Sequence, residues 1–462
     1  QIFTPKKVVL MMVDNLEEHD PGLFTRTDST FIDLYMKSGM YITEVVKKLF
    51  PHTRKFYDSD EACLKHILEN QVFGLAPTPI LQGITQTYIF GFDTEHKISR
   101  KNFVQHDLTP EAQEDKAKEK IYELFNLNKD MKFDAVVGNP PYQEMDGGAQ
   151  ASARPIYHLF VQEAKKINPR YISMITPSRW FVGGKGLDEY RKEMLNDNRI
   201  RIIHDYIRAD ELFPGVEIKG GVSYFLWDRD KRGDCEVNTY IDGKLTSKSI
   251  RPLLEKNAET FIRYNEAIPI LRKVQAKNEA SFSTNVQSAM AFGFRTFFKT
   301  FDSKTHKSNL VKVYANRAEG YIDRDKVTKN TEWIDKWKVI VPEAIGIGDM
   351  TKDIIKPIIA EPNSINTETY IMNGPYETEL EANNVYSYIN TKFFHFLLGI
   401  KKISQHTTRN VYDFIPLQDF TSSSDIDWSQ SIAEIDQQLY KKYGLSEEEI
   451  AFIEEKIKPM GD

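Results

Sequence analysis

A short turn after a predicted strand holds the side chains best suited to chemistry. The apolar, β-branched run Phe133–Val137 predicts a buried strand, and the two prolines that follow end it abruptly. The side-chain oxygen of Asn139 and the main-chain oxygen of Pro140 can each accept a hydrogen bond from one amino group, and Tyr142 can stack on a flat ring. Two acceptors on one amine hold its lone pair out of conjugation, so it can attack an electrophile without an ionised base. The catalytic residues that we predict are Asn139, Pro140, Pro141 and Tyr142.

With this Asn-Pro-Pro-Tyr turn the chain resembles the N6-adenine DNA methyltransferases of restriction-modification systems, and its motif order is that of the gamma class. The resemblance implies a doubly wound, Rossmann-like α/β sheet that binds S-adenosyl-L-methionine at its carboxyl edge. It further implies methyl transfer to an adenine flipped out of double-stranded DNA. Methylases of RNA bases and of protein glutamine share the turn, so these acceptors stay open. The alternative is a purely structural role, in which the turn is a rigid proline turn and Tyr142 packs in the core.

The same resemblance assigns residues upstream of the turn to cofactor binding: Phe3, Thr4, Asp33, Ser38, Gly39 and Asp107. Two of these side chains also have an ordinary structural interpretation. Thr4 is suited to cap a helix with Pro5 in its first position, and Asp107 is suited to cap a helix that begins at Thr109.

Two departures from the family pattern concern the cofactor site. Lys37 stands where the family has the first glycine of its cofactor loop. Leu75, Ala76 and Pro77 stand at the end of the second predicted strand, where an acid commonly takes the ribose hydroxyls. Ribose recognition is therefore unassigned, and a DNA-binding specificity module with a decayed cofactor site remains a rival hypothesis.

The hydrophobic pattern predicts how the chain is divided. Apolar runs near residues 29–33, 71–76, 101–108, 171–176, 200–207 and 222–227 predict strands, the last of which should end the sheet. Residues 111–132 read as one solvated helix, and residues 432–458 as two helices separated at Gly444, the second starting at Ser446. We predict a methyltransferase domain over 1–258, an α+β target-recognition domain over 259–430 and a C-terminal helical appendage over 431–462.

Basic and aromatic residues are mixed in the predicted target-recognition domain, with 11 Lys and Arg against 8 Asp and Glu between residues 285 and 350. Such side chains suit contacts with phosphates and base edges. The alternative is a small accessory domain with an ordinary solvated surface. For Phe181, the aromatic candidate, the alternative is packing in the core. The DNA contacts that we predict are Phe181, Arg295, Lys299, Lys304, Lys307, Arg317 and Arg409.

The composition sets further bounds. The 462 residues carry a net charge of −6, include only two cysteines, and place no two histidines at a paired metal-ligand spacing. No run of about eighteen apolar residues is present, so neither a membrane span nor secretion is expected, and a reducing cytoplasm fits. Because the chain begins with Gln1 and holds no convincing nuclease motif, we expect any restriction endonuclease domain or subunit to lie upstream.

Overall fold

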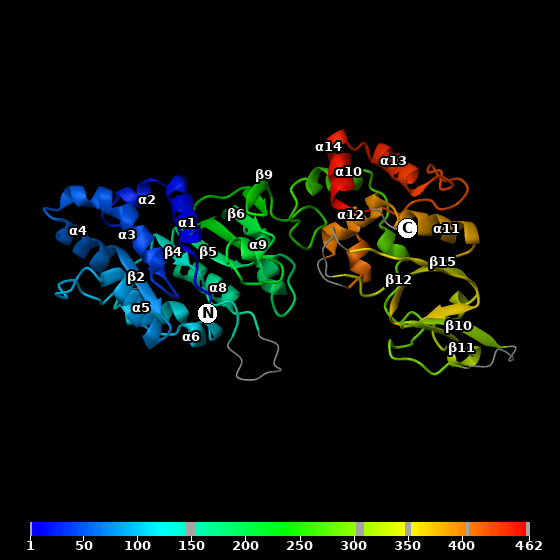
Figure 1. Ribbon diagram of the computed structural model, residues 1–462, viewed down its shortest axis with the longest axis horizontal. Coiled ribbons are helices and arrows are strands. Elements are labelled where there is room, and N and C mark those ends of the chain that lie inside the picture. The colour runs from blue at the N-terminus through cyan, green and yellow to red at the C-terminus, as the bar shows by residue number, and fades with distance from the viewer. Residues whose placement is uncertain are drawn as a thin grey trace. The chain divides into compact units, whose positions relative to one another are not determined.

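The computed structural model describes residues 2–128, 130–144, 154–301, 309–346, 353–402 and 406–458. The chain divides into two compact units, Gln1–Asn265 and Glu266–Asp462 (Figure 1). Each unit has its own sheet or sheets, and the predicted catalytic turn lies in the first.

A large sheet forms the centre of the first unit. Its strand order is β3-β2-β1-β4-β5-β7-β6-β8-β9, and β1 to β5 are parallel to their neighbours in that series. Strand β7 enters antiparallel between β5 and β6. The predicted α/β fold class with a largely parallel, doubly wound sheet is confirmed. The strands are β1 Phe31–Asp33, β2 Val72–Ala76, β3 Phe103–Gln105, β4 Ala135–Gly138, β5 Tyr171–Pro177, β6 Ile200–Tyr206, β7 Val222–Asp228, β8 Cys235–Ile241 and β9 Lys244–Arg251.

Helices cover both faces of this sheet, because successive side chains of a strand point to opposite sides. In β4, Ala135 and Val137 belong to one apolar core and Val136 to the other. The first core is closed by α1 Lys6–His19, α2 Gly22–Thr25, α3 Met40–Thr53, α4 Asp60–His66 and α5 Pro79–Phe90. The second is closed by α6 Thr109–Gln113, α7 Ala117–Leu124, α8 Tyr157–Ile167 and α9 Asp188–Asn196. Burial on both faces explains why the central strands are largely apolar.

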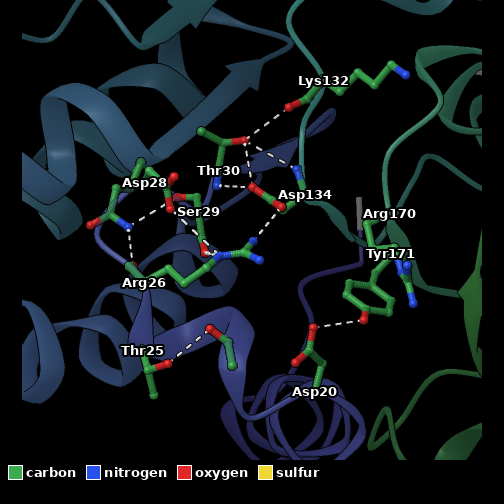
Figure 2. A network of polar contacts seen from close by, with 12 residues as sticks. Asp20, Thr25, Arg26, Asp28, Ser29, Thr30, Lys132, Asp134, Arg170 and Tyr171 are labelled. Carbon is green, nitrogen blue, oxygen red and sulfur yellow. Dashed lines mark hydrogen bonds and ion pairs between the residues drawn. The ribbon is translucent and has the colours of Figure 1, made fainter.

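A polar network holds the amino ends of the two central strands together. Figure 2 shows the carboxylate of Asp134, just before β4, accepting hydrogen bonds from Arg26 at 2.6 Å and from the main-chain nitrogen of Thr30 at 2.9 Å. The hydroxyl of Tyr171 donates to Asp20 at 2.8 Å and ties β5 to the segment after α1. With their starts fixed in this way, β1 and β4 deliver their carboxyl ends side by side.

Two predictions about helices are wrong. Helix α1 begins at Lys6 with Pro5 as its N-cap residue, so Thr4 lies outside the helix and caps nothing. Residues 111–132 do not form one helix: α6 and α7 are separated by a turn in which Asp115 has φ +63°. The charge-rich sequence is compatible with one long helix or with two short ones. Two helices form because Ala112 and Ile121 are both buried in the second apolar core.

The sheet also continues beyond the expected last strand. Residues 235–251 form the β8–β9 hairpin, which pairs with β6 through β8. Its turn is Asp242-Gly243, both with positive φ (51° and 71°), the backbone that a two-residue hairpin of this composition favours. The expectation that the sheet ends at Trp227 is therefore corrected.

The second unit contains two three-stranded sheets, ordered β11-β10-β14 and β13-β12-β15. Ser431 and Ser446 begin α13 and α14 with capping boxes, the latter as predicted from the three following glutamates. The elements are α10 Ala267–Ala276, β10 Leu310–Ala315, β11 Ala318–Asp323, β12 Trp337–Pro342, β13 Ile358–Ala360, β14 Ser364–Asn366, β15 Tyr370–Tyr376, α11 Glu379–Ile389, α12 Lys392–Lys401, α13 Ile432–Tyr443 and α14 Glu447–Lys456. Among the described residues, no helix combines the length and apolarity needed to cross a bilayer.

Candidate active site

A small pocket lies at the carboxyl ends of β1 and β4, where an open α/β sheet binds its ligands. It brings together side chains that are far apart in the sequence. Its lining includes Thr4, Asp33, Lys37, Ser38, Gly39 and Asn139. Four of the predicted cofactor residues and one predicted catalytic residue therefore share one pocket.

The amide of Asn139 is held at the edge of this pocket with one polar atom unused. The side chain is 3% exposed, and its Nδ2 donates to the hydroxyl of Thr4 at 2.9 Å. Its Oδ1 is buried and has no hydrogen-bond partner among the described residues. Because a buried acceptor without a donor costs free energy, this oxygen is suited to an incoming amino group. The contact with Thr4 also fixes which way the amide faces.

Tyr142 lies three residues after Asn139 in the predicted catalytic turn. Its half-buried ring packs edge-on to Tyr157, with the centroids 6.4 Å apart, while the ammonium of Lys37 lies over it at 5.7 Å from its centroid. Burial raises the pKa of its phenol, so the ring is uncharged at neutral pH. Tyr142 also packs against the second apolar core. The alternative interpretation, in which the ring only packs, therefore agrees with part of its surroundings. Pro140 and Pro141 are buried and hold the turn between the two residues.

Asp33, the last residue of β1, puts a carboxylate inside the pocket. Its Oδ1 accepts a hydrogen bond from the main-chain nitrogen of Tyr35 at 2.9 Å. Burial raises the pKa of Asp33 to about 7, against the opposing effects of the Tyr35 N–H and the Lys37 charge. A buried acid near its midpoint at neutral pH takes a cationic partner readily, because ion pairing restores the charged form.

Two glycines allow the backbone to pass this acid and enter the next helix. Gly39 has φ +77° and sits at the N-cap of α3, and a Cβ there would lie 2.9 Å from Ile89. Gly138 has φ +150°, and a Cβ there would lie 2.7 Å from Oδ1 of Asp33. Both positions therefore require glycine for space as well as for conformation.

We predict that Gly138→Ala lowers the free energy of unfolding by about 2 kcal/mol, because the new Cβ strains the backbone and presses on Asp33. The matched control is Gly83→Ala in α5, where a Cβ meets nothing within 4 Å and helix propensity favours alanine. Urea unfolding followed by circular dichroism should therefore move in opposite directions for the two variants. Equal stability of Gly138→Ala and wild type would show that the turn relaxes freely.

Lys37 reaches into the pocket between the acid and the catalytic turn. It is 8% exposed, and its Nζ lies 5.8 Å from the ring centroid of Tyr35 as well as 5.7 Å from that of Tyr142. Burial lowers the pKa of Lys37 to about 8, although the nearby Asp33 favours the charged form. The sequence shows this residue as a departure from the family but does not show that its ammonium enters the site.

The other predicted cofactor residues lie outside the pocket lining. Asp107 is exposed and accepts a hydrogen bond from the main-chain nitrogen of Thr109 at 3.0 Å, so the helix-start interpretation describes a real contact. Its charge also acts on Tyr35, where burial and Asp107 together raise the pKa to about 12. Asp107 thus borders the site, and its cofactor role stays a prediction. Phe3 is 47% exposed.

At the end of β2, where the resemblance predicts an acid for the ribose, the described residues Ala76, Pro77 and Thr78 carry no carboxylate. Strand β2 ends at Ala76, which is buried and pairs with Gln105 at the end of β3. Thr78 caps α5 through its hydroxyl, which accepts from the main-chain nitrogen of Leu81 at 3.3 Å. The end of β2 in the structure thus lacks the acid that is missing from the sequence.

Tyr41 was missed by the sequence reasoning. It lines the pocket from the first turn of α3 and its hydroxyl donates to the sulfur of Met12 at 3.2 Å. Burial raises its pKa well above the usual range, and the Thr4 hydroxyl acts against that rise. The local sequence does not show that Tyr41 lines the pocket, because its neighbours there come from α1 and the N-terminal segment.

The predicted DNA contact at Phe181 is corrected. Its side chain is 1% exposed and packs against Phe261, with centroids 4.4 Å apart, and against Trp180 at 4.6 Å. The chain after β5 makes a 3-10 turn, which directs this ring into the second apolar core. Phe181 therefore has no surface available for a base in this conformation.

The predicted basic contacts of the second unit are exposed where they can be described. Arg317 is in the β10–β11 turn, Arg295 pairs with Glu368 at 3.4 Å, and Nε of Arg409 donates to a main-chain oxygen at 2.8 Å. Lys299 is also exposed. Lys304 and Lys307 lie outside the described residues. The role of this set in DNA binding stays a prediction.

A larger groove of about 490 Å³ lies elsewhere in the first unit, lined in part by Asn198, Asp234 and Cys235. These residues lie at the amino ends of β6 and β8. Because β6 runs parallel to β5, the groove is at the sheet edge opposite the catalytic turn. It therefore does not compete with the smaller pocket as the site of chemistry.

The fold of this chain, with an Asn-Pro-Pro-Tyr turn at the end of β4, is similar to that of a solved restriction-modification enzyme. Residues 70–213 match the family model described as Eco57I restriction-modification methylase, and the predicted resemblance is confirmed. A protein of Mycoplasma pneumoniae (strain ATCC 29342 / M129 / Subtype 1), described as an uncharacterized adenine-specific methylase, is 25% identical over 304 residues. The match covers 54% of this chain and 72% of that protein.

Two solved structures share the fold at low sequence identity. The type IIL restriction-modification enzyme MmeI, in complex with DNA, aligns with a TM-score of 0.56 and 10% identity, over 98% of this chain and 78% of MmeI. A nuclease-deletion mutant of the type ISP enzyme LlaGI, in complex with a DNA substrate mimic, aligns with a TM-score of 0.50 and 12% identity, over 89% of this chain. This chain spans 46% of the LlaGI chain, so the likeness concerns the fold and not the whole enzyme.

Proposed function

We propose that this chain is a site-specific DNA adenine-N6 methyltransferase of a restriction-modification system, with S-adenosyl-L-methionine as methyl donor. The family match and the adenine-specific relative support the class. The observation that carries the proposal is Oδ1 of Asn139 at the carboxyl end of β4, which is buried without a hydrogen-bond partner in the described part of the chain, three residues before Tyr142. An acceptor and a ring in that order suit a flat base that offers an amino group.

The residues present fit the proposed cofactor at its methionine end. The buried carboxylate of Asp33 would pair with the cofactor's ammonium group, and Thr4, Ser38 and Gly39 line the same pocket. When bound, the cofactor supplies an electrophilic methyl group on a positively charged sulfur. No acid stands at the end of β2 to take the ribose, so cofactor affinity would depend more heavily on Asp33.

The catalytic turn would work by positioning. Oδ1 of Asn139 and the main-chain oxygen of Pro140 would accept the two amino hydrogens of adenine, while Tyr142 would stack on its ring. Rotating the base out of the duplex costs a few kcal/mol, which stacking and backbone contacts recover. No ionised base is required for the attack, and Thr4 would keep the amide of Asn139 in the accepting orientation.

The second unit would recognise the DNA. Its exposed cations, Arg295, Lys299, Arg317 and Arg409, are suited to phosphate contacts, which give affinity without sequence information. An RNA base or a protein glutamine is the competing acceptor.

Calorimetric titration of sinefungin, an unreactive analogue of the cofactor, tests the proposed cofactor site, with and without duplex DNA. We expect micromolar affinity for wild type and at least tenfold weaker binding for Asp33→Ala, because the ammonium would lose its only buried carboxylate among the pocket residues described. Asp28→Ala is the control, since that side chain is 89% exposed. Absence of binding to wild type under both conditions would favour the DNA-binding module with a decayed cofactor site.

A further inference from the structure

Lys37 places an ammonium group in the pocket proposed to hold the positively charged sulfur of the cofactor. The residue lies in the turn between β1 and α3, two positions before the left-handed Gly39. In the part of the chain that the structure describes, its ammonium lies over the rings of Tyr35 and Tyr142 and feels the carboxylate of Asp33. It therefore stands between the acid proposed for the methionine end and the ring proposed for the base.

The methyl-bearing sulfur of the cofactor has to approach the same place. The methyl group would have to reach an amino nitrogen held by Asn139, so the residues that line the pocket between that turn and Asp33 would lie near the sulfur. The cofactor sulfur is positively charged, whereas the sulfur of the product, a thioether, is neutral. In a site screened from water, two like charges a few ångströms apart repel strongly.

We propose that Lys37 makes this site discriminate between the charged cofactor and its uncharged product. The cofactor binds as Lys37 gives up its proton to the solvent, whereas the product binds with Lys37 still protonated. This inference rests on the proposed function and concerns the same pocket. Its consequence is that the free enzyme at neutral pH holds the product more tightly, relative to the cofactor, than a site with glycine at this position.

The other titratable groups around Lys37 limit how this can be measured. Asp33 faces it from the end of β1, Tyr41 from α3 and Tyr142 from the turn after β4, and Asp107 acts on Tyr35 from the end of β3. Burial raises the pKa of Asp33 to about 7, so Asp33 also loses a proton when an ammonium group binds beside it. Cofactor and product carry the same ammonium group, and proton loss from Asp33 is common to both.

The difference between the two ligands therefore reports on Lys37. Burial lowers the pKa of Lys37 to about 8, so the group is mostly protonated at pH 7 and mostly neutral at pH 9. If the cofactor binds only the neutral form, its affinity rises about tenfold for each pH unit below 8 and levels off above it. Product affinity follows only the ionisation of Asp33 and of the ligand's own amino group.

The experiment is calorimetric titration of S-adenosylmethionine and S-adenosylhomocysteine into wild type, Lys37→Met and Lys47→Met between pH 6.5 and 9, in buffers of different ionisation enthalpy. Lys47 is half-exposed on α3 and pairs with Glu44, so its variant controls for loss of a lysine. At pH 7 wild type should release close to one proton more with the cofactor than with the product. Lys37→Met should abolish that difference and raise cofactor affinity, relative to product affinity, by about tenfold.

Subtracting each free ligand's own titration isolates the protein's contribution, and the wild-type measurement alone tests the inference if Lys37→Met fails to fold. Equal proton release with both ligands in wild type would overturn it. An equal loss of affinity for both ligands in Lys37→Met would also overturn it, because Lys37 would then be binding their shared carboxylate. Failure of both ligands to bind wild type would overturn the proposed function itself, together with this inference.

Discussion

Asn139→Ala is expected to lower the rate of adenine methylation by about 10²- to 10³-fold while leaving DNA affinity within about twofold of wild type. The loss follows from removing one acceptor that orients the attacking amine, an interaction made most strongly as charge develops in the transition state. DNA affinity should persist because the proposed phosphate contacts belong to the second unit. Single-turnover methylation and a fluorescence-based DNA titration provide the two measurements.

Two further variants sharpen this prediction. Asn70→Ala removes an exposed asparagine of the first unit and should leave both quantities unchanged. Thr4→Val removes the hydroxyl that accepts from Nδ2 of Asn139 and should reduce the rate by less than Asn139→Ala, since the acceptor oxygen remains. Methylation by Asn139→Ala at the wild-type rate would exclude the assigned role of the amide.

Tyr142→Ala is expected to weaken capture of the target base by about 10- to 100-fold, because stacking of a base on an aromatic ring contributes roughly 1–3 kcal/mol. The readout is the fluorescence of 2-aminopurine at the target position, which rises when the base leaves the duplex stack. Tyr142→Phe keeps the ring and removes only the buried phenol hydroxyl. The phenylalanine variant should therefore retain the signal.

An identical rise in fluorescence for wild type and Tyr142→Ala would contradict stacking on this ring. It would support the alternative in which Tyr142 packs against the second apolar core and only shapes the turn. In that case Tyr142→Ala should lower the free energy of unfolding clearly. The methylation rate of the protein that remains folded should change little. Both quantities are measurable on the same preparation.

The catalytic turn and the strands around it were accessible from the sequence because several local signals agree. β4 is an apolar, β-branched run that ends in a glycine with positive φ, and two prolines follow. Strands β2, β5 and β7 are buried along their whole length, so they appear as largely apolar runs. Local composition and global fold point to the same structure in these segments.

The failures have tertiary causes. Phe181 is as apolar as a base-contacting residue would be, and only the contact with Phe261, 80 positions later, places it in the core. Strand β9 is largely exposed, so it lacks the apolar run that marks the other strands. The Asp242-Gly243 pair was the available signal for the β8–β9 hairpin.

The pocket shows the same limit at the level of single atoms. Thr4 and Asn139 are 135 positions apart, and they meet only because the segment before α1 and the residue after β4 line the same pocket. The local sequence favours Thr4 as a helix cap, but its hydroxyl accepts a hydrogen bond from Nδ2 of Asn139 in the predicted catalytic turn instead. The sequence likewise identified Lys37 as unusual without showing that its ammonium lies between two rings at the site.

The most direct test of the central claim is transfer of an isotopically labelled methyl group from S-adenosylmethionine to duplex DNA, followed by nucleoside mass spectrometry. Unmethylated genomic DNA, which offers many different sites, is the substrate, with total RNA and a protein mixture as competing acceptors. The account predicts labelled N6-methyladenine from wild type, and at most about a hundredth of that amount from Asn139→Ala. Label on RNA or on protein glutamine, or no transfer although the cofactor binds, would contradict it.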